Sequence, residues 1–412
     1  MRIAIIGGGA AGLMAAATLA EQTPGAQVVL IEKNDGLGKK VLISGGGRCN
    51  VTTGIADIRT VLTKYPRGGK FLNSALRGFP PDAVHAWFES HGVPLKIEED
   101  LRVFPISNDG HDIVDVFERL FRNSRVDIRL KTQAKSIRRA NGGFEIDLAG
   151  NEPLRADAVI LTTGGQAYRH TGSTGDGYGF AIGLGHRLTP LAASLNAFFT
   201  SEAWTTQISG LSFEKARIWT DRGPRLEATG PFLFTHKGVS GPAVFALSSL
   251  VAFETYDKAQ PLNLWIDLFP DRSAEDLGAE LDRTIAEHGR KAAGNVLGFV
   301  VSKSLAAILC RELAIDPEAH AAELPKADRR RIVSWLKAIP LHAVARGAGD
   351  EFVTAGGIDL ADVNPSTMES KLVPNLFFAG EILDIDGFTG GFNLQASWAT
   401  GRLAGTTLAE RV

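Results

Sequence analysis

A glycine turn between two short apolar segments near the start of the chain constrains its fold more than any other feature. Residues 3–6 (IAII) predict a buried strand, the turn GGGAAG follows at 7–12, and residues 13–19 predict a helix. A second apolar run at 28–31 ends in an acid, Glu32. Strand, glycine turn, helix, strand and terminal acid in this order are typical of a βαβ unit that binds a dinucleotide.

Each conserved position of such a unit has its own physical task, and the residue types here match those tasks. Gly7 permits the tight turn after the strand, and Gly9 lets the backbone approach a pyrophosphate. Gly12 lets the helix pack close to the strand, while the amides at the helix N-terminus face the phosphates. Glu32 can accept hydrogen bonds from a pair of ribose hydroxyls. The segment therefore predicts a site for a ligand with an ADP half.

The same stretch has an alternative interpretation as a targeting segment, because residues 3–20 carry no charge and follow Met1 and Arg2. Consecutive glycines at 7–9 would weaken an apolar helix, and a signal peptide does not explain the later strand that ends in Glu32. No other stretch of the sequence approaches the length of a membrane span. We therefore expect a cytoplasmic protein with no membrane partner.

Composition excludes several classes of protein. Lys and Arg total 44 against 46 Asp and Glu in 412 residues, a net charge of −2, which argues against a dedicated nucleic-acid surface. The two cysteines, Cys49 and Cys310, are too few and too far apart for a disulfide framework or a zinc site. The nine histidines show no spacing typical of metal ligands, so we expect no metal.

The pattern of the sequence changes at about residue 189 and again at about residue 346. Residues 1–188 hold the βαβ unit, 189–270 hold short alternating segments typical of strands, and 271–345 hold apolar positions at helical spacing. The glycine-rich strand-and-turn pattern returns in 346–412. We expect an α/β fold: a Rossmann-like nucleotide-binding domain built from both termini, with an inserted domain at 189–345 that combines a β-barrel-like part and a small helical part.

Local periodicity gives more detailed predictions for the first part of the chain. Residues 80–130 are expected to be largely helical, with apolar positions at helical spacing in 82–90 and 113–121. Residues 126–137 and 143–148 alternate in the manner of strands, and an Asn-Gly-Gly turn separates them. These two runs are therefore expected to form the arms of a hairpin.

A second glycine run lies at residues 39–50 (KKVLISGGGRCN), where two lysines, a serine, an arginine and an asparagine surround three glycines. A tight surface turn would explain the glycines but not the polar residues, so we favour a backbone cradle that contacts a ligand. Arg48 is a candidate to hold a substrate carboxylate or the ligand itself. Cys49 has no cysteine nearby, which favours a small buried residue over a redox thiol.

Two further glycine turns follow predicted strands. LTTGG at 161–165 ends the buried run 158–161, and TGSTGDG at 171–177 opens a helix; no Gly-Lys-Ser/Thr follows, so this is not a phosphate loop. Near the C-terminus, LFFAGE at 376–381 predicts a buried strand that ends in an acid, and GGFNLQ at 390–395 opens a small-residue helix. The acid can bind a ribose or ribityl hydroxyl, and the helix N-terminus can stabilise negative charge.

Together these motifs resemble the HI0933-like flavoproteins, a family often labelled as aminoacetone oxidases or as bile-acid reductase-like FAD enzymes. The resemblance covers nearly the whole chain. The TGDG segment at 174–177 is also similar to that of the flavoprotein subunits of fumarate reductases. The most specific matching stretches are GKKVLISGGGRCNVT from Gly38, FPISN at 104–108, TGSTGDGYGFAIGLGH at 171–186, FTHKGVSGPA at 234–243 and TMESKLVPNLFFAGEILDIDGFTGGFNLQ at 367–395.

The resemblance implies FAD in a two-part nucleotide-binding domain, with a β and helical insertion that covers the flavin. Glu32 would bind the adenosine ribose, and Ala134 would contact the adenine side. Residues 44–50 would lie along the isoalloxazine, while Gly380-Glu381 and 390–395 would hold the ribityl chain and the pyrimidine edge. The expected cofactor contacts are Gly7, Gly9, Ala10, Ala11, Gly12, Glu32, Lys33, Lys40, Ser44, Gly45, Gly46, Gly47, Arg48, Asn50, Ala134, Thr163, Gly164, Gly165, Gly380, Glu381, Gly391, Asn393 and Leu394.

These features predict an FAD-dependent oxidoreductase that acts on a small organic substrate by hydride transfer at flavin N5. An oxidase or dehydrogenase of an amine or alcohol fits, and so does a reductase of an activated double bond. Only one complete GxGxxG is present, which argues against a separate NAD(P)H domain, so NAD(P)H and oxygen are candidate redox partners that would visit the flavin itself. No catalytic residue is assigned; His236, in the turn at 235–242, and Arg48 are candidates.

Two other classes of function remain open. Some flavin-dependent RNA-modifying proteins also begin with a glycine-rich FAD site, and such a protein would need a basic groove with salt-sensitive RNA binding. The near-neutral charge of this chain argues against that class. A non-catalytic flavin-binding redox sensor would show no turnover with any electron donor. We therefore expect a small-molecule substrate and no nucleic-acid partner.

Overall fold

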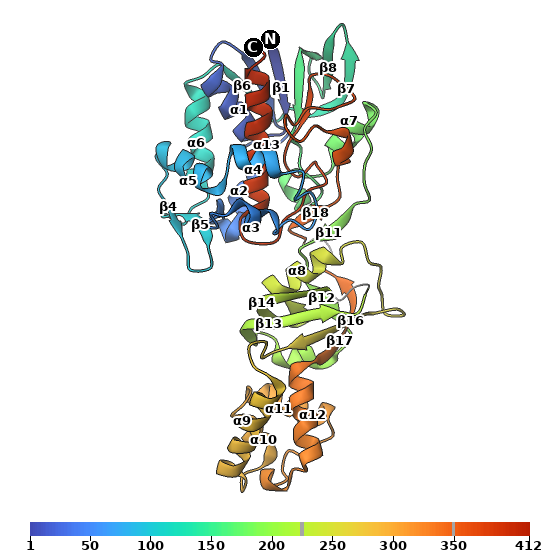
Figure 1. Ribbon diagram of the computed structural model, residues 1–412. Helices are drawn as coiled ribbons and strands as arrows, with labels where there is room; N and C mark the ends of the chain where they lie inside the picture. The colour runs from blue at the N-terminus through green and yellow to red at the C-terminus, as the bar shows by residue number, and fades with distance from the viewer. Residues whose placement is uncertain (223–225, 348–350) are drawn as a thin grey trace. The chain divides into compact units, whose positions relative to one another are not determined.

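The computed structural model describes residues 1–222, 226–347 and 351–412, and these form two compact units. Unit 1 comprises residues 1–194 and 349–412, and unit 2 comprises residues 195–348 (Figure 1). The first unit is thus assembled from both ends of the chain, and the second is an insertion. The residues 348–350 of the glycine-rich segment after Arg346 lie outside the described ranges.

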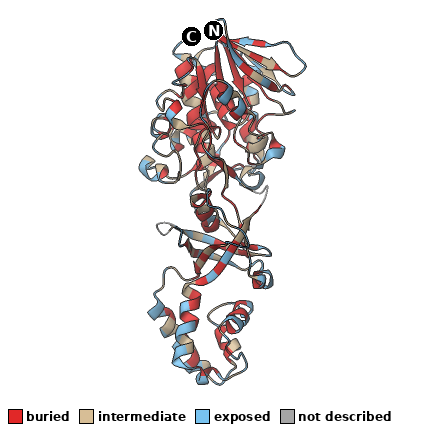
Figure 2. Ribbon diagram, turned by 90° about the vertical axis from the view of Figure 1, so that its right-hand side faces the viewer, coloured by how far each residue is buried: buried red, intermediate tan, exposed pale blue. Residues whose placement is uncertain are grey.

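The centre of unit 1 is a five-stranded parallel sheet with the strand order β19-β10-β1-β2-β6. Its strands are mostly continuous apolar runs, as expected for a parallel sheet that is covered on both faces. All residues of β10 and all but the first residue of β1 and β2 are buried (Figure 2). The strands are β1 (Arg2–Ile6), β2 (Gln27–Ile31), β6 (Val126–Arg129), β10 (Ala158–Leu161) and β19 (Leu376–Phe378).

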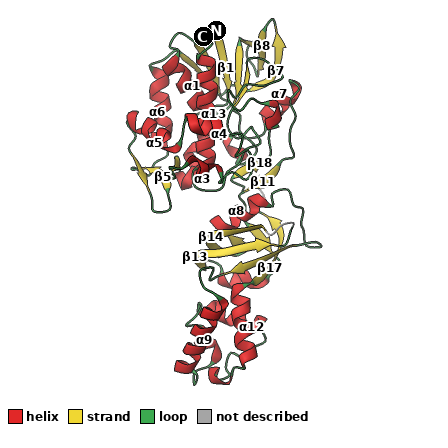
Figure 3. Ribbon diagram, in the orientation of Figure 1, coloured by secondary structure: helices red, strands yellow, loops and turns green. Residues whose placement is uncertain are grey.

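Helices cover one face of this sheet, and a small antiparallel sheet covers the other (Figure 3). Helix α1 (Ala10–Gln22) packs against the long C-terminal helix α13 (Phe392–Ala409), with Gly401 lying against the backbone of Ala11. The absence of a side chain at Gly401 allows the two helices to approach closely. The second sheet, made of β7 (Ala134–Ala140), β8 (Gly143–Leu148) and β9 (Leu154–Ala156) in that order, lies against β1 and β10.

The carboxyl ends of the parallel strands place the predicted motifs at one edge of the sheet. Strand β1 leads into Gly7, β2 into Glu32, β10 into Thr162 and β19 into Gly380 by way of Ala379. Ligands of open α/β sheets bind at this edge. The topology therefore brings glycine turns that lie far apart in the sequence to the same side of unit 1.

The expectation of a largely helical segment at 80–130 is wrong in part. The expected helices correspond to α5 (Pro81–Ser90) and α6 (His111–Arg122), but β4 (Leu95–Ile97) and β5 (Arg102–Pro105) lie between them. These strands are too short to show a period-two pattern, and they form a three-stranded sheet only by pairing with β3 (Thr52–Thr53), which lies far away in the sequence.

The expected hairpin arm at 126–137 is also corrected. It splits into β6, which joins the central parallel sheet, and β7 (Ala134–Ala140), which pairs with β8 (Gly143–Leu148). The other elements of unit 1 are α2 (Lys39–Ile43), α3 (Ile58–Leu62), α4 (Asn73–Gly78), β9 (Leu154–Ala156), α7 (Asp176–Gly183), β11 (Ala192–Ser194) and β18 (Val353–Ala355).

Unit 2 contains a closed barrel with the strand order β12-β15-β14-β13-β16-β17, and a group of helices is inserted along the chain between β16 and β17. Its own apolar core is separate from that of unit 1. Its elements are β12 (Phe198–Thr200), β13 (Ser212–Thr220), β14 (Leu226–Thr235), β15 (Gly238–Ser240), α8 (Pro242–Leu250), β16 (Leu262–Asp267), α9 (Ala274–His288), α10 (Ala293–Leu297), α11 (Lys303–Glu312), α12 (Lys326–Lys337) and β17 (Ile339–Arg346).

The barrel closes through a strand that the helical interpretation of 271–345 missed. Strand β17 pairs with both β16 and β12, and its residues Ile339, Leu341 and Ala343 are buried while their neighbours Pro340 and His342 are exposed. This alternation is the signal of a strand, but it follows directly on a helical pattern. Helices α9 to α12 lie between β16 and β17 along the chain.

Among the helices of the described residues, none combines the length and the apolar content needed to cross a bilayer.

Candidate cofactor site in unit 1

The first glycine turn combines a glycine required by packing, Gly12, with one that faces open space, Gly9. A side chain at Gly12 would overlap the carbonyl oxygen of Gly7, so close packing excludes any larger residue there. At Gly9, in contrast, a Cβ atom would meet no protein atom within 4 Å. Gly9 is the N-cap of α1, no side chain caps this helix, and its first turn carries no acid. The amides at this end are therefore available to an anion.

Glu32 holds the glycine turn against the end of β2. Its Oε2 accepts a hydrogen bond from the amide of Gly8 (2.7 Å), and its Oε1 accepts from the amide (2.8 Å) and side chain (2.7 Å) of Asn34. An ionised carboxylate has about four acceptor positions, so these three donors leave capacity for a further hydroxyl. Its expected contact with a ribose stays a prediction.

The glycine run at 44–47 forms an exposed backbone loop. Gly45, Gly46 and Gly47 have φ angles of 58°, 71° and 88°, in the left-handed region that favours glycine. A side chain at Gly46 or Gly47 would meet no atom within 4 Å. The hydroxyl of Ser44 turns back to the carbonyl of Val41 (2.7 Å). The loop thus presents bare backbone, as a ligand cradle requires.

Arg48 is anchored beside this loop rather than extended into solvent. Its Nη1 forms an ion pair with Glu98 (2.7 Å), and its guanidinium lies 3.7 Å from the ring centroid of Phe104. Both partners belong to the β4–β5 region, which the sequence patterns did not reveal. Nearby, the buried Asn50 accepts a hydrogen bond from the amide of Val103 (3.2 Å). The β4–β5 hairpin therefore positions two residues of the second motif.

Two lysines expected in the site form ion pairs with acids of other motifs. Lys40 contacts Glu381 (2.5 Å), which also accepts a hydrogen bond from the amide of Thr354 (2.9 Å). Lys33 contacts Asp176 at the start of α7 (2.8 Å), and the pKa of Asp176 is lowered because Lys33 and neighbouring donors outweigh its burial. The ion pair of Lys40 and Glu381 thus joins the segment 39–50 to the segment 376–381.

The C-terminal motif forms a second helix end without a side-chain cap. Gly391 is the N-cap of α13, and the first turn of this helix carries no acid. Asn393 fixes the preceding loop, because its Oδ1 accepts from the amide of Gly387 (2.8 Å) and its Nδ2 donates to the carbonyl of Gly387 (2.8 Å). The positive end of the α13 dipole is therefore available to negative charge.

The remaining expected contacts occupy the interior of unit 1 and the turn after β10. Ala10 and Ala11 are buried in the first turn of α1, Ala134 is buried at the start of β7, and Leu394 is half-buried in α13. Gly164 lies against Ser173, and Gly165 lies against Thr354 and Glu381. The hydroxyl of Thr163 is buried without a hydrogen-bond partner among the described residues, so this turn retains a free polar group.

Two buried polar residues, Tyr178 and Asp384, lie in unit 1 outside the set of contacts expected from the sequence, and Tyr178 interacts electrostatically with Glu381. The hydroxyl of Tyr178 and Oδ1 of Asp384 are buried without a hydrogen-bond partner in the described part of the chain. Burial raises the pKa of both groups, and the negative charge of Glu381 adds to the effect on Tyr178. Both residues lie inside quoted motifs, at 171–186 and 367–395, but no spacing rule distinguishes them from their neighbours.

His236, the other catalytic candidate, lies on the exposed turn between β14 and β15 in unit 2. Its backbone carbonyl accepts a hydrogen bond from Thr206 (3.2 Å). Its role as a proton donor stays a prediction.

We predict that neither cysteine reacts in the folded protein. Burial raises the pKa of Cys49 to about 12, and burial also raises the pKa of Cys310, so the thiolate is scarce at pH 8. A chromogenic disulfide reagent should therefore label less than a tenth of the thiols in native protein within minutes, and both thiols after unfolding in guanidinium. Rapid labelling of native protein that is lost in Cys49→Ser would show that Cys49 is a reactive thiol.

Comparison with known proteins places this architecture in a family. A family model described as HI0933-like protein Rossmann domain matches residues 1–407. The chain belongs to the HI0933-like family. This confirms the resemblance based on the glycine motifs, and with it the Rossmann-like fold with an inserted barrel and helices.

Two named enzymes are similar to this HI0933-like protein over nearly its whole length. A 3-dehydro-bile acid delta(4,6)-reductase of Clostridium scindens is 30% identical over 412 residues, which is 100% of this chain and 99% of that protein. A ribosomal RNA dihydrouridine synthase of Escherichia coli is 29% identical over 399 residues, or 96% of this chain and 95% of that protein. The expectation of an oxidoreductase that uses a flavin is confirmed at the level of the family.

Two solved structures share the fold. A 3-ketosteroid delta1-dehydrogenase from Sterolibacterium denitrificans has a TM-score of 0.52 at 14% identity and covers 100% of this chain and 99% of its own. A variant of E. coli quinol fumarate reductase has a TM-score of 0.51 at 16% identity and covers 100% of this chain and 70% of its own. At these identities the likeness describes the fold alone.

Proposed function

We propose that this HI0933-like protein is an FAD-dependent reductase of a carbon–carbon double bond conjugated to a carbonyl group. The observation that carries the proposal is the pair of enzymes that match nearly the whole chain at about 30% identity. A 3-dehydro-bile acid with a delta-4 double bond is a conjugated enone, and the uracil ring of uridine carries its 5,6 double bond next to a carbonyl. The two reactions share this chemistry although their substrates differ.

FAD, rather than a smaller flavin, fits the residues of unit 1. The open space beyond Gly9 and the uncapped start of α1 suit the pyrophosphate of an ADP half. The bare backbone of Gly46 and Gly47 and the uncapped start of α13 suit a flat ring that gains negative charge. When bound, the flavin would supply two-electron hydride chemistry, with NAD(P)H as the proposed donor.

Within this proposal, each group of residues has a stated task. Glu32 would hold a ribose hydroxyl with its remaining acceptor capacity. The ion pair of Lys40 and Glu381 would orient the carboxylate toward the ribityl chain. The two hydrogen bonds between the side chain of Asn393 and the backbone of Gly387 would hold the first amides of α13 in position. These contacts would bind and orient the cofactor, and none of them requires the transfer of a proton.

Saturation of the double bond would add a hydride to the carbon β to the carbonyl and a proton, supplied by solvent water, to the α carbon. Negative charge develops on the carbonyl oxygen, so the site needs a hydrogen-bond donor for it. We propose Arg48 for this task, because its ion pair with Glu98 and its stacking on Phe104 fix the guanidinium while part of its five N–H donors remains available. The arginine would then act as a preorganised donor rather than as an acid.

Product analysis tests this function. The flavin-loaded protein should oxidise NADPH in the presence of a 4-en-3-one steroid or of uridine-containing RNA, and the product of the accepted substrate should gain two hydrogen atoms by mass. A steroid with an isolated double bond is the matched control and should not be reduced. The proposal is wrong if no conjugated substrate is reduced while a small amine or alcohol is oxidised.

A further inference from the structure

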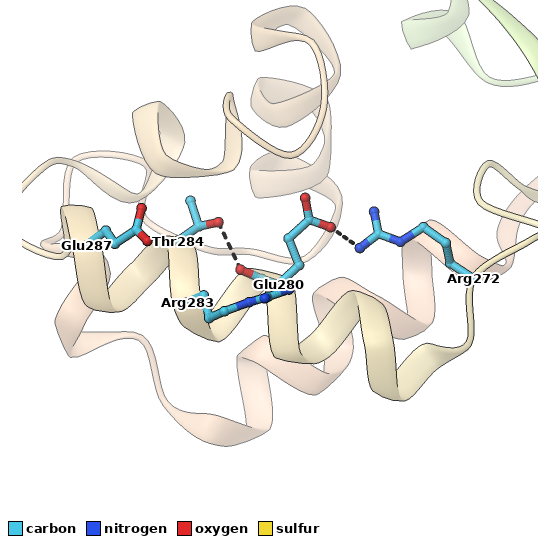
Figure 4. Close-up of a pocket in the computed structure, with 5 residues that line it drawn as sticks. All are labelled: Arg272, Glu280, Arg283, Thr284 and Glu287. Atoms are coloured by element: carbon cyan, nitrogen blue, oxygen red, sulfur yellow. Dashed lines mark hydrogen bonds and ion pairs between the residues drawn. The ribbon is translucent and has the colours of Figure 1, made fainter.

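The helical part of unit 2 presents a polar cleft along one face of α9. Arg272, Glu280, Arg283, Thr284 and Glu287 line it (Figure 4). Arg272 and Glu280 form an ion pair across the cleft, and the hydroxyl of Thr284 bonds to the carbonyl of Glu280 (2.8 Å). Positions three and four apart share one face of a helix, so the lining from Glu280 to Glu287 continues to His288 at the end of α9.

An exposed aromatic ring stands just beyond this end of the helix. Phe299 is 56% exposed, although a phenylalanine of a small helical group would ordinarily be buried. The ring of His288 lies 4.7 Å from its centroid, and Nζ of Lys291 lies 4.9 Å from it. The aliphatic stem of Lys303 lies close to Gly298, the residue before Phe299. The ring is thus held in place by neighbours that carry or can carry positive charge.

The charge of this segment differs from that of the whole chain. Between residues 283 and 303 the sequence has four basic residues and one acid, Glu287, whereas the whole chain has a net charge of −2. Within residues 1–222, 226–347 and 351–412, none of the four basic side chains forms an ion pair with a carboxylate. The four are Arg283, Arg290, Lys291 and Lys303.

We propose that this surface, formed by Arg283, His288, Arg290, Lys291, Phe299 and Lys303, binds single-stranded RNA. An exposed ring beside cations that form no ion pair is the arrangement by which proteins stack an unpaired base and neutralise the adjoining phosphates. A duplex would hide the faces of its bases from Phe299. The choice of RNA rests on the proposed function, because uracil is the nucleic-acid base typical of RNA that carries a double bond conjugated to a carbonyl.

Fluorescence anisotropy with a short fluorescein-labelled oligouridylate tests the surface in the flavin-loaded full chain. Phe299→Ala should weaken binding about tenfold, since stacking of one base contributes on the order of 1–3 kcal/mol, and Phe299→Trp should restore it. Arg290→Ala with Lys291→Ala should lower the slope of log Kd against log salt by about 1.4, because each phosphate contact on a single strand contributes about 0.7.

Control variants distinguish RNA binding at this surface from non-specific binding to exposed cations. They also distinguish RNA binding from the proposed reaction. Arg125→Ala, which removes an exposed cation of unit 1, should leave RNA binding unchanged, and Phe299→Ala should leave reduction of a 4-en-3-one steroid unchanged. The inference fails if wild-type protein does not bind the oligonucleotide at low salt, if Phe299→Ala binds as tightly as wild type, or if NADPH displaces the RNA. RNA binding that depends on Phe299, in a protein that reduces neither the steroid enone nor uridine-containing RNA, would reject the proposed function and retain this surface.

Discussion

Replacement of Gly9 by aspartate is expected to leave the protein folded and to remove its flavin. Space beyond Gly9 is open, and its backbone (φ −83°, ψ −172°) is the extended conformation that an aspartate N-cap adopts. The new carboxylate would accept hydrogen bonds from the first amides of α1. It would thus occupy the amide donors that we propose for a pyrophosphate and would repel the negative charge of that group. We expect flavin affinity to fall by about a hundredfold or more.

The flavin-to-protein absorbance ratio after gel filtration measures this effect, and a thermal melt checks the fold. Gly25→Asp is the matched control, because Gly25 also faces open space but lies in the turn after the other end of α1. It should retain full flavin. A Gly9→Asp protein with wild-type flavin content would mean that the cofactor does not use the start of α1.

The second large effect concerns the buried ion pair of Arg67 and Asp386. Asp386 is fully buried, bonds to the guanidinium of Arg67 and accepts a hydrogen bond from Ser194 (2.7 Å). These residues come from three distant parts of unit 1, so the pair fixes the loop before α13 to the rest of the unit. Asp386→Ala leaves a charged guanidinium in a largely buried place. It should lower the free energy of unfolding by about 3–5 kcal/mol.

Urea denaturation of the single and paired variants measures this loss. Arg67→Met combined with Asp386→Leu removes both charges and keeps apolar volume, so it should recover most of the stability. A single variant within about 1 kcal/mol of wild type would show that the pair is not needed to hold this loop. The same variants also test whether flavin content depends on the loop before α13.

The sequence predicts those parts of the fold whose characteristic residues lie close together along the chain. The βαβ unit is recognisable because one strand, Gly7 to Gly12, one helix and Glu32 follow one another within a short span. Strands β4 and β5 are not recognisable from the sequence, because a segment of three or four residues is too short to show a period. They form a sheet only by pairing with β3. Strand β17 is masked by the helical pattern of α12 just before it.

In the candidate site, too, the sequence predicts local features but not contacts between distant residues. Glycine turns after strands predict which backbone faces the ligand, because parallel strands bring their carboxyl ends together. Side-chain pairing across the chain is not visible in the spacing of residues. Lys40 and Glu381 lie 341 positions apart and Arg48 and Glu98 lie 50 apart, so their contacts depend on the topology of the sheet and on the unforeseen hairpin. Tyr178 and Asp384 stand out only in the structure, where a side-chain oxygen of each is buried without a hydrogen-bond partner among the described residues.

The most direct test of the central claim is a single-turnover experiment without oxygen. The flavin-loaded protein is reduced with dithionite and mixed with a conjugated enone steroid, with uridine-containing RNA, or with a steroid whose double bond is isolated. We predict that one of the conjugated substrates restores the visible absorption of oxidised flavin and gains two hydrogen atoms, while the isolated alkene does neither. Flavin that stays reduced with every conjugated substrate but reoxidises with oxygen alone would contradict the claim.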